Sequence, residues 1–217
     1  MTDKLFLVEG LRFSYNKSLT LSCDSLVIKP SLCTVFRGPN GSGKTTMLKI
    51  LNNLLGPFAG RVEFDGQAVQ ESTELRRRSM YVHQHPVMFA STVEANIRHA
   101  MRLKKYGKAE ADTRLASINR EFNLDALLNK KANRLSGGET QRVAIARAIA
   151  CGVDTLLFDE PTSSMDREMD AIIKKMLLKL KNDGYSIIMA SHDDELIDAI
   201  ADHVVSFERG VCKGQEN

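Results

Sequence analysis

The chain has 217 residues, of which 43% are hydrophobic and 26% are charged, as in an ordinary globular protein. This length fits one large domain, or a core that carries an inserted subdomain. The 30 basic and 27 acidic residues leave a net charge of +3, which is too balanced to predict nucleic acid as the main partner.

Hydropathy and cysteine usage are typical of a cytoplasmic protein. No stretch reaches the roughly 18 uninterrupted apolar residues of a membrane span, so any membrane-embedded part is expected on another chain. The first residues lack the apolar segment of a signal peptide. The four cysteines have no C-x-x-C spacing, and we expect them to be free thiols in a reducing compartment.

The first elements expected are two antiparallel strands, at the apolar runs of residues 5–8 and 26–28. Tyr15 falls in the turn-rich segment predicted between them. Its ring could stack on a purine base, because bases stack on aromatic faces, or it could pack on the core at a strand end. The residues alone leave both interpretations open.

A glycine-rich loop, G-x-x-x-x-G-K-T, begins at Gly38 between a predicted buried strand at residues 34–36 and a predicted helix at residues 47–51. A phosphate-binding loop requires that strand–loop–helix context. Glycines let backbone N–H groups approach phosphates, and a helix N-terminus favours anions. Lys44 is placed to reach the β- and γ-phosphates, and Thr45 to ligate Mg²⁺. The predicted nucleotide-binding residues of this loop are Gly38, Pro39, Asn40, Gly41, Ser42, Gly43, Lys44, Thr45 and Thr46.

The segment after the loop predicts short strands and then helices. Residues 61–66 alternate as a strand that ends on an Asp-Gly turn, and residues 80–82 form another strand. The arginines at residues 76–78 are expected to face solvent, without a functional role. From about residue 92 to residue 129 the pattern turns helical, with apolar positions three to four apart within residues 109–122, and predicts a small helical insertion.

The next helix is predicted to begin at Ser136-Gly137-Gly138-Glu139. Ser136 with Glu139 three residues later is a capping box, which by itself explains the sequence structurally. Two glycines at an exposed helix N-terminus could instead form a second anion site. The pattern does not choose between these interpretations.

Two later strands end on polar side chains. Residues 155–158 predict a buried strand followed by Asp159 and Glu160, at the edge where parallel sheets place their ligands. Asp159 can hold Mg²⁺, and Glu160 can orient or deprotonate a water that attacks the γ-phosphate. Residues 187–190 predict another strand, and His192 at its end is expected to sense the phosphate.

Together these motifs resemble the ATP-binding cassette (ABC) family, the ATPase subunits of ABC transporters, over essentially the whole chain and in that family's order. Residues 38–46 match the Walker A loop, and residues 156–160 match the Walker B strand. Gln84 matches the Q-loop glutamine, and His192 matches the switch histidine. Residues 135–139, Leu-Ser-Gly-Gly-Glu, match the signature found only in this family among P-loop proteins.

Two shorter matches accompany these motifs. Tyr15 matches the aromatic A-loop position, which favours stacking on the base. Residues 163–166 resemble the D-loop, with Ser164 and Met165 where alanine and leucine are commoner, and with Asp166 in place.

The resemblance implies an α/β P-loop NTPase fold, with a RecA-like parallel-sheet core, an antiparallel β-subdomain and an inserted α-helical subdomain. We therefore expect one ABC ATPase domain over residues 1–217. The core and the β-subdomain are expected at residues 1–86 and 155–217, and the helical subdomain with the signature at residues 87–154.

The resemblance also assigns roles to residues, with ATP and Mg²⁺ as cofactors. The implied catalytic residues are Glu160, His192, Lys44 and Gln84. The implied Mg²⁺ ligands are Thr45, Gln84 and Asp159. The implied contacts to an ATP held by a second copy of the cassette are Ser136, Gly137 and Gly138, and Asp166 is implied as a further ATP-binding residue. Each composite site then needs a dimer, and the signature acts as the second anion site.

The implied partners are a second cassette, expected to be an identical copy, and a transmembrane permease at the cytoplasmic face of the cell membrane. An extracytoplasmic solute-binding protein would complete an importer, and no nucleic acid is expected. The compact length and residues 86–89 are similar to importers of oxyanions such as tungstate or phosphate. A two-component exporter is the first alternative. The second is a non-transport mechanoenzyme acting on DNA, ribosomes or iron–sulfur assembly, whose long coiled-coil insertion or second cassette this chain lacks.

Overall fold

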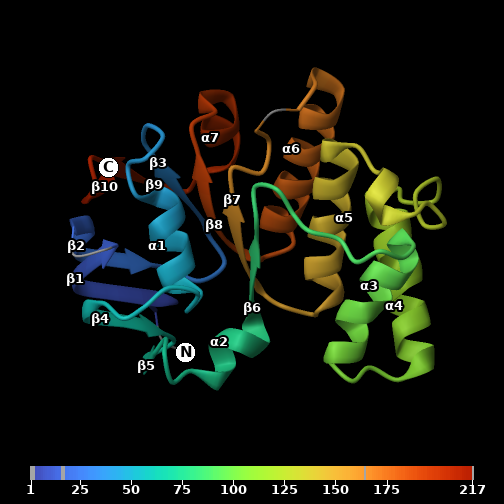
Figure 1. Cartoon of the computed structure of the whole chain (residues 1–217), viewed down its shortest axis with the longest axis horizontal. Coiled ribbons are helices and arrows are strands. Elements are labelled where there is room, and N and C mark those ends of the chain that lie inside the picture. The colour runs from blue at the N-terminus through green and yellow to red at the C-terminus, as the bar shows by residue number, and fades with distance from the viewer. Residues whose placement is uncertain (1–2, 16–17, 164, 217) are drawn as a thin grey trace. The chain divides into compact units, whose positions relative to one another are not determined.

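The computed structural model describes residues 3–15, 18–163 and 165–216 (Figure 1). The chain folds into two compact units. The first unit comprises the described residues within Met1–Tyr81, Asp154–Glu160 and Leu178–Asn217, and the second comprises those within Val82–Val153 and Pro161–Leu177.

The first unit is built on one sheet, in which the described strands follow the order β5-β4-β1-β2-β10-β9-β3-β8-β7-β6. The strands are β1 (Phe6–Tyr15), β2 (Ser18–Ile28), β3 (Cys33–Arg37), β4 (Ala59–Phe64), β5 (Gln67–Ala68), β6 (Ser79–Val82), β7 (Thr155–Asp159), β8 (Ser186–Ser191), β9 (His203–Glu208) and β10 (Val211–Glu216). β1 pairs antiparallel with β2 and β4, whereas β3 is parallel to β8 and β9, and β7 is parallel to β8. The sheet is therefore mixed, with an antiparallel part and a parallel part.

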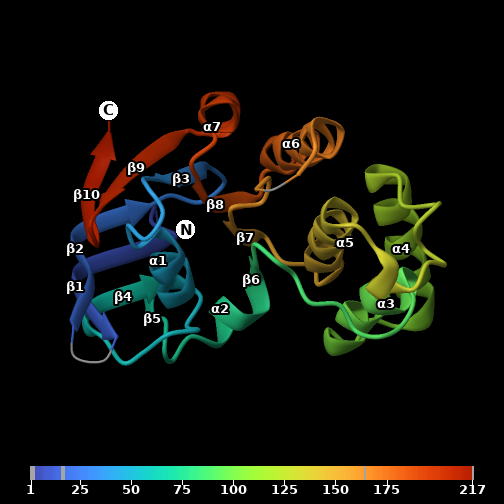
Figure 2. The same cartoon turned by 45° about the horizontal axis from the view of Figure 1, so that its top comes forward.

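Helix α1 (Lys44–Leu51) joins the two parts of the sheet through the hydrophobic core. The sheet is curled, and α1 packs against it (Figure 1, Figure 2). Met47 and Leu51 of α1 are fully buried in a cluster with Phe64 of the antiparallel part and Phe36 and Leu157 of the parallel part. Burial of each such side chain contributes roughly 1.5–3 kcal/mol, so the phosphate-loop helix is fixed by the core on both sides.

The remaining helices of the first unit are short. They are α2 (Thr73–Arg78) and α7 (Asp194–Ile200), which are capped by the side chains of Ser72 and Asp193. Helix α6 (Arg167–Asn182) starts in the second unit and ends in the first.

The second unit is helical. Its elements are α3 (Val93–Leu103), α4 (Lys108–Phe122), the 3₁₀ turn η1 (Ala132–Arg134) and α5 (Gly137–Ala150). α3 and α4 both pack on α5. Thr92 caps α3 by accepting from the Ala95 N–H. The fully buried Asn96 donates to the carbonyl oxygens of Phe89 and Thr92, and so fixes the backbone that precedes the helix.

The α/β fold predicted from the sequence is confirmed, and the structure corrects two local expectations. The predicted loop around Tyr15 is strand, because β1 continues to Tyr15 with Leu11 and Phe13 buried between exposed neighbours. The apolar run from which the strand was predicted therefore gave too short a length for β1, because half of the residues in this strand are exposed. The expectation that the arginines at residues 76–78 only face solvent is wrong for Arg78, which forms ion pairs with Asp65 and Asp154.

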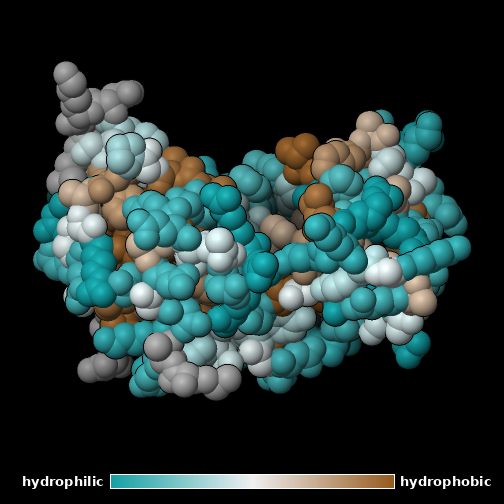
Figure 3. All heavy atoms as spheres, turned by 90° about the horizontal axis from the view of Figure 1, so that it is seen from below, coloured by the Kyte–Doolittle hydropathy of each residue, from teal (hydrophilic) through white to brown (hydrophobic). Residues whose placement is uncertain are grey.

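The surface agrees with the composition. In the space-filling view of Figure 3, hydrophilic residues cover most of the face shown, and hydrophobic residues are scattered among them. Among the described helices, none combines the length and the apolar character needed to cross a membrane. All four cysteines are buried free thiols, as expected.

Candidate functional site

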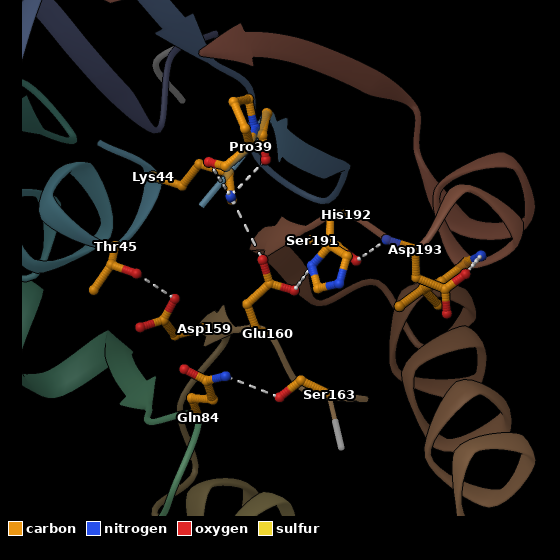
Figure 4. A network of polar contacts seen from close by, with 12 residues as sticks. Pro39, Lys44, Thr45, Gln84, Asp159, Glu160, Ser163, Ser191, His192 and Asp193 are labelled. Atoms are coloured by element: carbon orange, nitrogen blue, oxygen red, sulfur yellow. Dashed lines mark hydrogen bonds and ion pairs between the residues drawn. The ribbon is translucent and has the colours of Figure 1, made fainter. Parts of the chain in front are cut away.

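Three neighbouring strands of the first unit end at one edge of the sheet. β3, β8 and β7 are parallel, with Arg37 opposite Ser191 and Asp159 opposite Ala190. The chain therefore leaves these strands on the same side of the sheet, which is where α/β proteins bind ligands. The glycine-rich loop follows β3, Glu160 follows β7, and His192 follows β8 (Figure 4).

The glycine-rich loop leads directly into α1. At Gly38 a Cβ atom would lie 2.2 Å from the carbonyl oxygen of Phe207 in β9, so no larger residue fits against that strand. The N-cap of α1 is Gly43, which makes no side-chain capping bond, unlike the N-caps of α2, α3, α5 and α7. The first N–H groups of α1 thus receive no N-cap side chain, and together with the helix dipole they favour an anion at this end.

Lys44 is a buried cation held by its own loop. Its residue is 5% exposed, and its Nζ donates to the carbonyl oxygens of Gly38 at 2.7 Å and Pro39 at 3.2 Å. Nζ also lies 3.6 Å from Oε1 of Glu160. Ser42 Oγ is buried nearby in the loop and has no hydrogen-bond partner among the described residues. A buried ammonium and an unpaired hydroxyl in one loop are groups that a phosphate oxygen could satisfy.

Asp159 at the end of β7 is 5% exposed and accepts one hydroxyl hydrogen bond on each oxygen. Thr45 Oγ1 donates to Oδ1 at 2.7 Å, and Tyr81 Oη donates to Oδ2 at 2.7 Å. Burial, and then the hydrogen bond and charge of Asp159, raise the pKa of Tyr81. The phenol is therefore a donor toward this carboxylate. Thr45 Oγ1 and Asp159 Oδ1 lie side by side in the site, and both are oxygen ligands of the kind that Mg²⁺ prefers.

Glu160 occupies a strained backbone position. Its φ is +48°, in the left-handed region that costs a non-glycine residue about 1–3 kcal/mol and that concentrates at functional sites. The Glu160 N–H donates to the Ala190 carbonyl at 3.0 Å, which holds the turn against β8. Its carboxylate is nearly buried, and Oε2 lies 2.8 Å from Nδ1 of His192 (Figure 4). The His192 side chain is 61% exposed, whereas that of Glu160 is 11% exposed.

The signature residues lie in the second unit, at the start of α5. Ser136 accepts from the Glu139 N–H at 3.2 Å, and the Glu139 side chain accepts from the Ser136 N–H at 2.9 Å, so the predicted capping box is present. The Lys130 ammonium, and after it the Ser136 N–H, lower the pKa of Glu139. Gly138 lies against α6: a Cβ there would be 2.0 Å from Cγ of Met169.

The other predicted site residues have defined local contacts. In the second unit, Gln84 Nε2 donates to Ser163 Oγ at 3.1 Å (Figure 4), and Asp166 Oδ1 accepts from the Met169 N–H at 2.8 Å. In the first unit, Tyr15 is 45% exposed, and its ring stands edge-on to Phe13 with the centroids 4.8 Å apart. Ser164 of the predicted D-loop lies outside the described residues.

Comparison with known proteins agrees with this geometry. The family model described as "ABC transporter" matches residues 21–163. The tungstate uptake ATP-binding protein TupC of Peptoclostridium acidaminophilum is 34% identical over 204 residues, which cover 94% of each chain. The chain belongs to the ABC transporter family.

One further relative and one solved structure support the assignment of this chain to the ABC transporter family. The nickel import ATP-binding protein NikO of Rhodobacter capsulatus is 33% identical, over 94% of this chain and 86% of its own. The structure of cbiO1 from Clostridium perfringens, part of the ABC transporter complex cbiONQ, has a TM-score of 0.88 at 28% identity and covers 100% of this chain and 89% of that chain. This protein is therefore a nucleotide-binding ATPase subunit of an ABC transporter, as its motifs predicted.

Sequence reasoning missed one side chain of this ABC site. It placed Tyr81 on a strand and gave it no role, whereas the structure joins Tyr81 to Asp159. The available signal was a polar aromatic side chain on a buried strand shortly before Gln84. That signal did not reveal the contact with Asp159. The neighbour of β6 in the sheet is β7, about 75 residues later in the chain, and no local pattern encodes that pairing.

Proposed function

We propose that this ABC subunit binds ATP with Mg²⁺ at the edge formed by β3, β7 and β8, and that its hydrolysis of ATP drives solute import through a separate membrane permease. The observation that carries the proposal is the convergence of a phosphate loop, two carboxylates and a histidine at that edge. In this family such a site would bind a nucleotide and activate a water in one place.

The loop and Lys44 would bind the phosphates. The N–H groups at the start of α1 would face the phosphates without a competing N-cap side chain, and Lys44 Nζ already lies in the loop. On ATP binding, Lys44 would exchange its carbonyl contacts and its 3.6 Å approach to Glu160 for phosphate oxygens. That exchange would release the Glu160 carboxylate for catalysis.

Mg²⁺ would be held by Thr45 and Asp159, with Gln84 as a further ligand. These residues fit the ion because Thr45 Oγ1 and Asp159 Oδ1 are 2.7 Å apart and both are oxygen atoms of the kind that ligate Mg²⁺. The ion would supply positive charge that neutralises the phosphate oxygens as the terminal phosphate is transferred.

Glu160 would act as the general base. Its Oε2 is hydrogen-bonded to His192 Nδ1, and its Oε1 has no hydrogen-bond partner among the described residues. Once Lys44 has moved to the phosphates, Oε1 can accept the proton of the attacking water while His192 fixes the orientation of the carboxylate. His192, exposed on the turn before α7, would then contact the γ-phosphate.

The second unit would act on the nucleotide of another copy of the chain. Ser136, Gly137 and Gly138 begin a helix whose capping box already satisfies part of its N-terminus, and its positive end would face the phosphate of the partner's ATP. Asp166 would contribute from the D-loop, and Tyr15 would stack on the adenine of the ATP in its own chain. We therefore propose a homodimer with composite sites, and one ABC domain whose helical subdomain spans residues 87–154.

The relatives support a proposal for the partners and the cargo. Two of them are named for the uptake of tungstate and the import of nickel, and both match this chain over 94% of its length. We propose a permease that holds the subunit at the cytoplasmic face of the membrane, a solute-binding protein outside, and a small ion as cargo, with an oxyanion as the first candidate.

The test of the site is Glu160→Gln. The amide keeps the size of the side chain but cannot take a proton, so ATPase turnover should fall by about two or more orders of magnitude while ATP affinity is retained. Turnover is measured by phosphate release and affinity by equilibrium titration. ATP should then also hold the variant as a dimer on size exclusion. Turnover equal to that of the wild type would reject Glu160 as the base.

A further inference from the structure

Tyr81 is bonded to the reaction site without belonging to any of its motifs. It lies on β6, next to β7 in the sheet, and is 8% exposed. Its hydroxyl donates to Asp159 Oδ2 at 2.7 Å, the short distance of a hydrogen bond to a charged acceptor. The opposite oxygen, Oδ1, receives the Thr45 hydroxyl at the same distance of 2.7 Å. The carboxylate is thus clamped between one hydroxyl from β6 and one from α1.

The clamp matters because the Asp159 side chain has little else to orient it. The terminal torsion of an aspartate is broad, so its rotamer does not fix which oxygen points toward a ligand. Asp159 is 5% exposed, and water is therefore a poor substitute for a lost donor. With Tyr81 on Oδ2, the lone pairs of Oδ1 stay on the side of Thr45.

We propose that Tyr81 is a positioning residue for Asp159: by occupying Oδ2 it presents Oδ1, beside the Thr45 hydroxyl, to the metal ion that accompanies ATP. The inference rests on the proposed role of Asp159 as a Mg²⁺ ligand. Tyr81 belongs neither to the phosphate loop nor to the end of β7. If it acts through the metal ligand, its loss should weaken nucleotide binding only when Mg²⁺ is present.

The test compares the affinity for a non-hydrolysable ATP analogue in Mg²⁺ and in EDTA, by equilibrium titration of the full chain. Tyr81→Phe removes only the hydroxyl. The affinity in Mg²⁺ should fall about three- to tenfold, the size of one hydrogen bond, and the affinity in EDTA should stay unchanged. The matched control is Tyr106→Phe, which removes a hydroxyl in the second unit, where the ring lies under Arg114. It should leave both affinities unchanged.

A double-mutant cycle with Asp159→Asn shows whether Tyr81 acts through Asp159. Asp159→Asn alone should abolish most of the gain in affinity that Mg²⁺ provides, and adding Tyr81→Phe should then have no further effect. Additive losses, equal losses in Mg²⁺ and EDTA, or no loss at all for Tyr81→Phe would each overturn the positioning role. If Asp159→Asn itself kept the full Mg²⁺ effect, the metal assignment of the proposed function would be wrong, and the role of Tyr81 would fall with it.

A thermal unfolding measurement separates these outcomes from misfolding. Tyr81→Phe keeps the ring that fills the buried space beside β7, so its melting temperature should lie within a few degrees of that of the wild type. Tyr81→Leu, which loses both the ring and the hydroxyl, should lose stability in addition to the Mg²⁺ effect. A Mg²⁺ effect seen only in the leucine variant would assign Tyr81 a packing role and contradict the proposal.

Discussion

At the scale of single residues, the site contains buried polar groups that hold one another in place. The Lys44 ammonium is bonded to two carbonyl oxygens of its own loop and approaches Glu160, whose other oxygen is bonded to His192. Buried charges are costly unless they are paired, so each member of this set fixes the others. The same interactions keep the groups in place until a nucleotide competes for them.

Lys44→Ala tests the phosphate-binding end of this set. Without the ammonium, the loop loses its charge for the β- and γ-phosphates, and ATP affinity should fall about tenfold or more. The matched control is Lys49→Ala, which removes a lysine from the last turn of the same helix. It should leave the affinity unchanged. Equilibrium titration with ATP measures both variants, and wild-type affinity for Lys44→Ala would refute the assignment of the loop.

At the scale of elements, two contacts join segments that are distant in the sequence. In the first unit, Arg78 at the end of α2 bridges Asp65, in the turn after β4, and Asp154, before β7, and its guanidinium lies 5.3 Å from the centroid of the Phe64 ring. In the second unit, Gly138 at the start of α5 lies against Met169 of α6. The first contact is electrostatic and aromatic, and the second is steric.

Arg78→Met should destabilise the first unit by about 1–2 kcal/mol, because it removes two ion pairs and a cation–π contact that are only partly exposed. Arg78→Lys keeps the charge but cannot form a fork to both carboxylates, and should recover part of the loss. Arg76→Met, at an exposed neighbour, is the control and should have little effect. Chemical denaturation measures all three, and equal stabilities for Arg76→Met and Arg78→Met would contradict the bridge.

Substitutions at the two signature glycines should have opposite effects on stability. A Cβ at Gly137 meets nothing within 4 Å, so Gly137→Ala should stabilise the helix by up to about 1 kcal/mol. A Cβ at Gly138 would overlap Cγ of Met169, and Gly138→Ala should destabilise by about 1–3 kcal/mol. Met169→Ala added to Gly138→Ala makes room and should return part of the loss. Thermal unfolding without nucleotide measures these changes, and a loss that Met169→Ala does not relieve would rule out the steric cause.

At the scale of the whole molecule, the two groups of predicted ATP-binding residues belong to different units. The phosphate loop and its carboxylates belong to the first unit, and the signature belongs to the second. Under the proposed function, a complete site then needs two chains, and work on a solute needs a permease. The described helices include none that could span a membrane.

A pull-down of the tagged Glu160→Gln chain from solubilised native membranes tests whether the subunit binds a second copy of itself and a permease. In ATP we expect a second copy of the chain and a multi-span permease, together with a solute-binding protein whose ligand identifies the cargo. The matched control is the same variant carrying Lys44→Ala, which should lose the ATP-dependent second copy and keep the permease. A permease recovered without any binding protein would favour export, and recovery of no membrane protein would contradict the transport role of this site.

The sequence by itself predicted the candidate site residues and the strands that carry them. Asp159 ends a buried strand, and Lys44, Glu160 and His192 come after buried strands. Parallel strands that are neighbours in a sheet end at one edge, so local patterns were sufficient to predict that these residues converge. Only the tertiary structure decided which side chains support them. The Tyr81 hydroxyl on Asp159 depends on a contact between strands far apart in the chain. Such contacts leave no trace in periodicity or composition, because they are set by the pairing of strands and the packing of the core.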